Sequence, residues 1–348
     1  MSISKAARSV IVLGMAFLVS PLFATGVPEA GTEVVNVYSH RHYDTDRALF
    51  EAFTEETGIE VRVVEAGADE LIQRLRAEGE QTEADVLITV DAARLNRAKS
   101  MDLLQSVSSE SLEERIPSHL RERDGHWYAL TKRARVIAYH NERSDRSILS
   151  TYEALAESDF DDAIAIRSSG NVYNQSLLAS IIAHNGAETA RQWAAGVVDN
   201  MARDPQGGDR DQLKAIAAGE ADYAVVNTYY IGQMLNSTDP QEQQVGEQIG
   251  VFFPNQEGRG AHVNVSGAGV TRHAKNRDNA VRLIEFLVSD RAQERFAKAN
   301  YEYPVVDDVD LAPSVAAWGE FKEDSLDLSR LGEHNDEAVR IFDEVGWQ

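Results

Sequence analysis

The sequence predicts an α/β fold of two lobes with a cleft between them, on three observations. The chain has 348 residues, too many for one small core and suited to two lobes of ordinary domain size. Segments that alternate like strands are followed repeatedly by segments with the apolar spacing of helices. Long extended segments near 133–141 and 251–270 break that rhythm, and we expect them to be two hinge crossings between the lobes.

The first lobe is predicted from residue 33 onward. Residues 33–39 alternate as a strand does. Asp44 or Thr45 is expected to cap the following helix, because short polar side chains accept hydrogen bonds from free helix amides, and Gly58 is expected to end it. Further elements are expected at 60–65 (strand), 69–78 (helix), 85–89 (strand) and 91–98 (helix). This alternation predicts parallel strands covered by helices on both faces.

A second series follows the first crossing. Strands are expected at 163–167 and 223–227, extended segments at 251–253 and 263–271, and helices at 173–184, 188–198, 212–218, 277–289, 292–299 and 335–344. We expect an N-terminal lobe of 32–131 plus 256–302 and a C-terminal lobe of 132–255 plus 303–348. Open parallel sheets bind ligands beyond the carboxyl ends of their strands, so a ligand is expected in the cleft.

The beginning of the chain has the pattern of a secretory signal peptide at 1–24. Lys5 and Arg8 precede an apolar stretch, and the small residues Ala24, Thr25 and Gly26 follow it. A membrane anchor is the alternative, but the stretch is short for a bilayer span and there is no Cys to carry a lipid. We expect cleavage between 24 and 30 and a periplasmic protein that is not embedded in the membrane.

Composition excludes several classes of protein. The chain has no Cys, so disulfides, thiolate metal sites and thiol nucleophiles are excluded, and any metal must be held by O and N donors. The formal net charge of −23 disfavours nucleic acid as a partner. The common hydrolase, metalloprotease, phosphate-loop and dinucleotide motifs are absent, and we expect no enzyme.

Tyrosines follow the ends of three predicted strands. His42-Tyr43 follows the first strand, Tyr173 follows the strand expected at 163–167, and Tyr229-Tyr230 follows the strand expected at 223–227. Both lobes would therefore direct phenols into one cleft. This spacing alone also fits ordinary tyrosines at a cleft rim, or the aromatic lining of a sugar or peptide site.

Phenols favour a hard, highly charged cation over other ligands. Fe³⁺ prefers anionic oxygen, and a nearby trivalent cation lowers the phenol pKa from its ordinary value of about 10. Four phenolates around one Fe³⁺ leave one excess negative charge, so a compensating cation is expected. Arg133, near the first crossing, is the candidate.

The chain resembles the periplasmic ferric-iron-binding proteins of ABC importers, and within them the FutA-like branch with a His-Tyr pair. The resemblance covers about 33–304 and rests on these stretches: VYSHRHYDTD, ETGIEVRVVEAGADELIQRL, ADVLITVDAARL, TKRARVIAYHN, IRSSGNVYNQSL, ARDPQGGD, NTYYIGQML and FFPNQEGRGAHVNVSGAGV.

The resemblance implies a two-lobed periplasmic-binding-protein fold, like a transferrin clamshell, that carries Fe³⁺ as cargo. It implies Fe³⁺ ligands at the tyrosine of R-H-Y (Tyr43), of N-x-Y-N-Q (Tyr173) and of the double tyrosine (Tyr229, Tyr230). The histidine of R-H-Y (His42) is a ligand in some members, and the arginine of T-K-R-A-R (Arg133) lies near the iron without binding it. His40 is an additional imidazole in this sequence.

Three functions follow as hypotheses. The first is capture of Fe³⁺ by a monomer that delivers it to the permease subunits of an ABC importer. The second is binding of another small solute by the same fold, such as an anion, a polyamine or a carbohydrate. The third is a secreted enzyme, for which the sequence offers no recognisable nucleophile and base.

Overall fold

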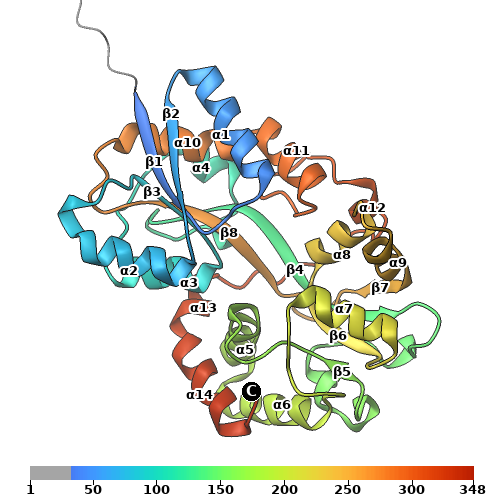
Figure 1. Cartoon of the computed structure of the whole chain (residues 1–348). Coiled ribbons are helices and arrows are strands. Elements are labelled where there is room, and N and C mark those ends of the chain that lie inside the picture. Colours follow the sequence, from blue (N-terminus) through green and yellow to red (C-terminus); the bar gives the residue numbers. More distant parts are fainter. Residues whose placement is uncertain (1–32) are drawn as a thin grey trace, which may run out of the picture. The chain divides into compact units, whose positions relative to one another are not determined.

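The computed structural model describes residues 33–348, and the predicted signal peptide lies outside this range. Eight strands form one sheet: β1 Val34–Ser39, β2 Glu60–Glu65, β3 Val86–Val90, β4 Tyr128–His140, β5 Ile164–Ala165, β6 Tyr223–Asn227, β7 Ile249–Phe252 and β8 Val263–Val270. Their order is β2-β1-β3-β8-β4-β6-β5, and β7 pairs with β4 (Figure 1).

Helices cover the strands (Figure 1). The first group is α1 Asp44–Thr57, α2 Ala68–Glu78, α3 Ala92–Ser100 and α4 Glu110–Arg115. The second is α5 Val172–Asn185, α6 Ala187–Asp199, α7 Asp209–Ala218, α8 Thr228–Leu235 and α9 Pro240–Gln248. The third is α10 Arg277–Leu287, α11 Asp290–Ala299, α12 Pro313–Ala316, α13 Ser329–Glu333 and α14 Asn335–Val345. Helix α10 packs on β1, while α14 packs on α5 and α6.

Strand direction changes in the middle of the sheet. Strands β1, β2 and β3 are parallel, as expected, and so are β5 and β6. Strands β8 and β4 run antiparallel to each other and to their other neighbours. These two strands come from the extended segments, for which the sequence predicted crossings between the lobes and no strand direction.

Strand β4 connects the two halves of the sheet. Its first part, 128–134, pairs with β8, and its last part, 135–140, pairs with β6 and β7. Consequently β1, β2 and β3 reach β5 and β6 only through β8 and β4. Both long strands are buried almost throughout, as expected for residues inside a sheet that helices cover.

Local boundaries confirm most of the expected elements, with two corrections. The N-cap of α1 is Tyr43, whose side chain makes no capping bond, and Asp44 instead pairs with Arg47 at 3.2 Å. Gly58 ends α1 at φ 73°, as predicted. Strand β5 ends at Ala165, and the carbonyl of Arg167 beyond it accepts from the Asn174 side chain at 2.7 Å and from the Trp347 indole at 3.0 Å.

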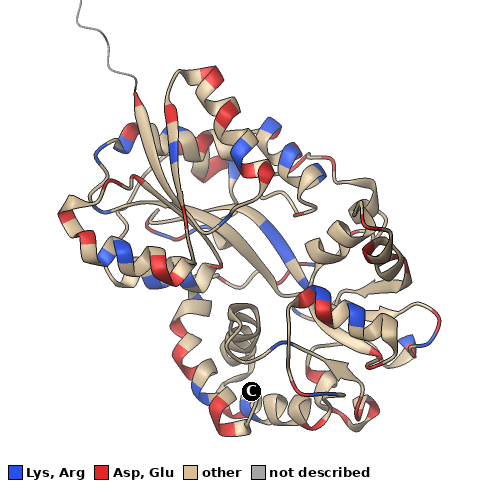
Figure 2. Ribbon diagram, viewed as in Figure 1, with Lys and Arg blue, Asp and Glu red and all other residues tan. Residues whose placement is uncertain are grey.

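Asp and Glu residues are spread over many helices of the described chain and alternate with Lys and Arg (Figure 2). This distribution agrees with the scattered acidic residues of the sequence, and it is typical of a solvated surface. Within residues 33–348, no helix is both long enough and apolar enough to span a membrane.

Candidate metal centre

Tyr43 lies between β1 and α1, where the chain leaves the sheet. Its backbone is extended, with φ −80° and ψ 145°, and its carbonyl accepts hydrogen bonds from the first turn of α1. The ring of His42 stacks on the ring of Tyr43, with centroids 5.7 Å apart. Tyr43 is half-buried and His42 is exposed, so the two side chains offer a phenol and an imidazole on neighbouring residues.

Tyr173 lies in the first turn of α5. The side chain of Asn171 caps this helix and accepts a hydrogen bond from the backbone N–H of Tyr173 at 3.1 Å. Asn171 therefore fixes the point at which the helix begins, and with it the direction of the phenol.

Tyr229 and Tyr230 lie in the first turn of α8, which follows β6 without a loop. Their ring centroids are 4.2 Å apart. The backbone N–H of Asn227, at the end of β6, donates to the buried carboxylate of Asp209 at 2.7 Å. The strand end that carries both tyrosines is thereby attached to the first residue of α7.

These elements bring the predicted residues together. The hydroxyls of Tyr173 and Tyr229 are 3.2 Å apart. His42, Tyr43, Tyr173 and Tyr230 line one cavity of about 460 Å³. Phenols from β1–α1, α5 and α8 thus converge although their sequence positions span nearly 190 residues.

Arg133, the predicted compensating cation, lies behind this cluster. It is 1% exposed, and its Cζ is 5.7 Å from the centroid of the Tyr173 ring. Its Nη1 donates to Ser266 Oγ at 3.1 Å, while its Nε and Nη2 have no hydrogen-bond partner within the described chain. No carboxylate of residues 33–348 forms an ion pair with it, so a buried positive charge faces the phenols without a direct counter-ion.

Sequence reasoning missed two further arginines at the site. Arg135 and Arg167 lie 5.7 and 5.6 Å from the Tyr173 ring centroid, and both pair with Asp209, at 3.2 and 3.3 Å. Arg135 was detectable, because residues two apart on a strand face the same side and it therefore shares the side of Arg133. For Asp209 the sequence offers no comparable signal.

Burial makes Tyr43, Tyr229 and Tyr230 harder to deprotonate than ordinary phenols, because it raises the pKa of each. It raises the pKa of Tyr43 to about 12, and it holds the pKa of Tyr229 and of Tyr230 well above the ordinary phenol value, with the neighbouring charge of Tyr173 adding to the shift. A ligand that uses these oxygens as anions must therefore displace protons from them. A highly charged cation can do this, whereas a sugar has no means to.

His40 lines the same cavity and is half-buried. Burial lowers the pKa of its imidazole to about 4, and the nearby Arg94 acts in the same direction, so the ring is neutral at neutral pH. Its Nδ1 has no hydrogen-bond partner among the described residues.

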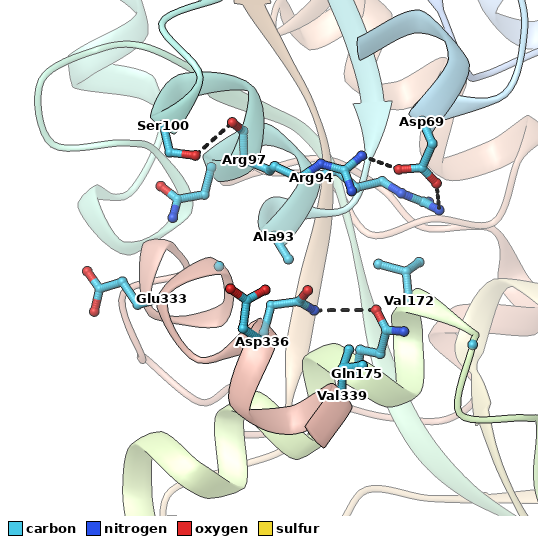
Figure 3. A pocket seen from close by; sticks show the side chains of 14 residues that line it. Asp69, Ala93, Arg94, Arg97, Ser100, Val172, Gln175, Glu333, Asp336 and Val339 are labelled. Carbon is cyan, nitrogen blue, oxygen red and sulfur yellow. Dashed lines mark hydrogen bonds and ion pairs between the residues drawn. The ribbon is translucent and has the colours of Figure 1, made fainter. Parts of the chain in front are cut away.

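A larger cavity of about 690 Å³ adjoins the phenol cavity and shares Arg94, Gly170 and Val172 with it. Figure 3 shows Arg94 and Arg97 both directed at Asp69, with Glu333 and Asp336 on the opposite side. None of the predicted ligands lines this larger cavity, so we assign the metal chemistry to the smaller one.

Another group of potential metal ligands in the described chain consists of Glu122, Asp124 and His126. Glu122 already accepts from Lys99 at 2.6 Å and from the His126 ring at 2.9 Å, and it accepts the backbone N–H groups of Asp124 and His126. Both oxygens of this carboxylate already accept hydrogen bonds that close a turn, so we do not assign a metal to this group.

Comparison with known proteins defines the class first. The family model described as bacterial extracellular solute-binding protein matches residues 48–323. The chain is 49% identical over 342 residues to iron uptake protein A1 of Synechocystis sp., covering 97% of this chain and 95% of that protein. Two solved structures are also similar. One is FutA (IdiA) of Trichodesmium in complex with iron and citrate, with TM-score 0.88, 46% identity and coverage of 90% and 100%. The other is the ferric binding protein from Campylobacter jejuni, with TM-score 0.86, 47% identity and the same coverage.

The chain thus belongs to the bacterial extracellular solute-binding proteins and, within them, to the FutA-like ferric-iron-binding family. It has their two-lobed periplasmic-binding-protein fold, and it is a periplasmic protein. The predicted family and fold class are confirmed. The relatives are solute-binding proteins of transport systems.

Proposed function

We propose that this protein captures one Fe³⁺ in the periplasm and delivers it to the permease subunits of an ABC importer. Tyr43, Tyr173, Tyr229 and Tyr230 supply four anionic oxygens, and His42 adds a neutral nitrogen. Iron is the cargo, and its capture displaces protons from the phenols but changes no covalent bond of the protein backbone or of a substrate. Related proteins whose names specify iron or ferric binding support the choice of metal.

One observation carries this proposal: a buried arginine without a counter-ion lies behind convergent phenols. Four phenolates and Fe³⁺ leave one excess negative charge, and Arg133 offers the opposite charge within the same buried space. Hard anionic oxygen is the donor type that Fe³⁺ prefers. The charge of the loaded site would balance without any further ion.

Several finer statements belong to the same proposal. Residues 1–24 act as a signal peptide cleaved between 24 and 30. The lobes comprise 32–131 plus 256–302 and 132–255 plus 303–348, which places Tyr43 on one lobe and the other three tyrosines on the opposite lobe. The protein works as a monomer and has no enzymatic activity, since its relatives are transport proteins.

Binding of a small anion alone is the second candidate, because Arg94, Arg167 and Arg210 line the phenol cavity. Each of these arginines is already paired with a carboxylate, namely Asp69, Asp209 and Glu242. This pairing reduces the attraction of the cavity for an anion. The iron proposal accounts for the phenols, whereas the anion proposal does not.

Visible absorption tests the two candidates directly. The purified mature chain is mixed with Fe³⁺ supplied as ferric citrate, freed of excess by gel filtration, and assayed for iron content and colour. We expect one iron per chain and a phenolate-to-iron charge-transfer band. Colourless protein without iron would refute the proposal. If calorimetry then showed that citrate or phosphate binds without iron, the small-anion function would be favoured.

A further inference from the structure

A buried group of charged side chains lies directly behind Tyr43. Arg41 donates from Nε to Asp46 at 2.9 Å, and it donates to both oxygens of Glu302, at 3.1 and 2.9 Å. Arg41 and Glu302 are each 2% exposed, and Asp46 is 4% exposed. A two-point contact between guanidinium and carboxylate fixes the plane of the guanidinium as well as its place.

That guanidinium supports the ring of Tyr43. Its Cζ is 5.0 Å from the centroid of the Tyr43 ring and 5.2 Å from the centroid of the Phe296 ring. The Arg41 guanidinium therefore lies close to two aromatic rings, that of Phe296 in α11 and that of Tyr43. If Arg41 changed its orientation, the ring of Tyr43 would lose the surface that it packs against.

Glu302 is held in turn by the long strands β4 and β8. It accepts from Thr131 Oγ1 at 2.9 Å, from Asn300 Nδ2 at 2.6 Å and, more weakly, from Ser266 Oγ at 3.5 Å. Ser266 Oγ also accepts from Arg41 at 2.7 Å and from Arg133 at 3.1 Å. One hydroxyl thus joins the arginine behind Tyr43 to the arginine behind Tyr173.

We propose that Glu302 is a positioning residue for the metal centre, which acts on Tyr43 through Arg41. This inference rests on the proposed binding of Fe³⁺ at the phenols. Glu302 touches neither the phenols nor the space between them. Its carboxylate holds Arg41 in the plane that supports the Tyr43 ring, and it attaches the loop before α1 to strands β4 and β8.

Iron affinity in a double-mutant cycle tests whether Glu302 acts through Tyr43. Glu302→Gln keeps the shape of the side chain but replaces one oxygen and removes the charge. We expect it to weaken Fe³⁺ binding about 10- to 100-fold and to shift the charge-transfer band. In a Tyr43→Phe background the same substitution should change affinity by less than about twofold. Equal losses in both backgrounds would overturn the proposal.

Two further variants separate positioning from general damage. Glu302→Asp retains the charge on a shorter side chain, and we expect it to restore part of the lost affinity. Glu122→Gln is the matched control, since Glu122 is also a 2%-exposed, ion-paired carboxylate and none of its partners lines the phenol cavity. Its iron affinity and band should equal those of the parent, and a loss like that of Glu302→Gln would overturn the assignment.

Hydrogen exchange of the iron-free chain supplies a test that does not depend on the metal. Glu302→Gln should speed exchange in peptides that cover residues 40–46 and leave peptides that cover 171–176 unchanged. Unchanged exchange at 40–46 would overturn the role of Glu302. A parent chain that fails to bind iron would instead refute the proposed function, and the exchange result would still decide whether Glu302 holds the loop.

Discussion

Tyr229 and Tyr230 are consecutive residues with different surroundings. Tyr229 is 3% exposed and shares a hydrogen bond with Tyr173, while Tyr230 is half-buried and lines the phenol cavity. Neighbouring side chains in the first turn of a helix point about 100° apart, so two adjacent donors can approach one ion from different sides. In the proposed site, the double tyrosine would therefore supply two donors from a single strand end.

We expect Tyr229→Phe and Tyr230→Phe each to weaken Fe³⁺ binding by orders of magnitude, because each variant loses one anionic donor. Competition against a chelator of known affinity measures the loss. Tyr223→Phe is the matched control, since Tyr223 begins the same strand and its hydroxyl donates to the Asp145 carbonyl at 2.8 Å, away from the cavity. Parent-like affinity and absorption in both site variants would contradict the ligand set.

His42 differs from the tyrosines, because it is exposed and its Nδ1 contacts the His40 carbonyl at 3.3 Å. We expect His42→Ala to keep its colour with a shifted band and to lose far less affinity than a tyrosine variant. Absorption and affinity both matching the parent would show that His42 is not a ligand. Loss of all colour would show that iron binding depends on His42 more strongly than we propose.

Acid should release the iron. The pKa of Tyr43, raised to about 12 by burial, means that the empty site holds this proton more tightly than an unfolded chain does. Binding of Fe³⁺ must displace the proton, so iron affinity falls as pH falls. We expect the band to fade as the iron-loaded protein is titrated downward from pH 7, and a band that persists in strong acid would contradict this.

The raised pKa of Tyr43 also affects the stability of the iron-free chain, but in the opposite direction: this stability falls as pH rises. Because the folded pKa lies above the ordinary value of about 10, Tyr43 contributes stability below pH 10, and this contribution is lost as pH rises toward 12.

At the scale of residues, the sequence predicted which phenols gather in one region but not the residues that support them. Tyrosines after strands are visible as a pattern, and the structure places all four around one region. Glu302 and Asp209 were not predictable, because they reach the site from distant segments and an isolated carboxylate carries no local signal. Their role depends on which arginines the fold brings beside them.

At the scale of elements, the starts of α5, α7 and α8 meet around Asp209. Its carboxylate is fully buried and accepts from Arg135, from Arg167 and from the N–H of Asn227. The first residue of α7 thus sets the position of β6 and, through it, of the helix that carries Tyr229. Carboxylates near a helix N-terminus also interact favourably with the helix dipole.

We expect Asp209→Asn to lower the free energy of unfolding by about 3–5 kcal/mol, because it leaves the buried Arg135 without its counter-ion. Urea unfolding of the iron-free chain measures the change. Asp211→Asn is the control on the same helix, since Asp211 is exposed and bonds only the local Gly208 N–H. An equal loss of stability in the two variants would show that the buried pair of Asp209 and Arg135 contributes no more than an exposed carboxylate does.

Helices and strands with clear periodicity were predicted within a few residues, and α1, β2 and β6 are examples. Helix α8 was not predicted beyond a turn, because its tyrosines and apolar residues also fit a strand. Strand β5 was predicted too long, since the side chains of Asn174 and Trp347 bond the Arg167 carbonyl and the strand pattern does not encode such contacts.

At the scale of the whole molecule, strands β4 and β8 are the shared elements between the predicted lobes. Iron held by Tyr43 and by the other three tyrosines would link the lobes and favour a closed state. The order of segments predicts which residues belong to each lobe. The antiparallel pairing of β4 with β8 was not predictable, because pairing between distant strands leaves no pattern in either of them.

Small-angle scattering should show a smaller radius of gyration with iron than without it. The Tyr43→Phe variant is the control, because it removes the donor on one side and should reduce the compaction. Identical profiles for the iron-free and iron-loaded parent would contradict closure about β4 and β8.

The position of β8 between β3 and β4 also constrains how the chain folds. Strand β3 ends at residue 90 and β4 at residue 140, but the strand that joins them ends only at residue 270 of 348. During synthesis, β3 and β4 therefore lack the strand that lies between them until most of the chain has been made. Pairing between such distant segments is slow, because the entropy of closing a long loop is lost before the contacts form. A chain with this topology stays incompletely folded while it emerges, and a polypeptide that must be threaded across a membrane before it folds benefits from that delay.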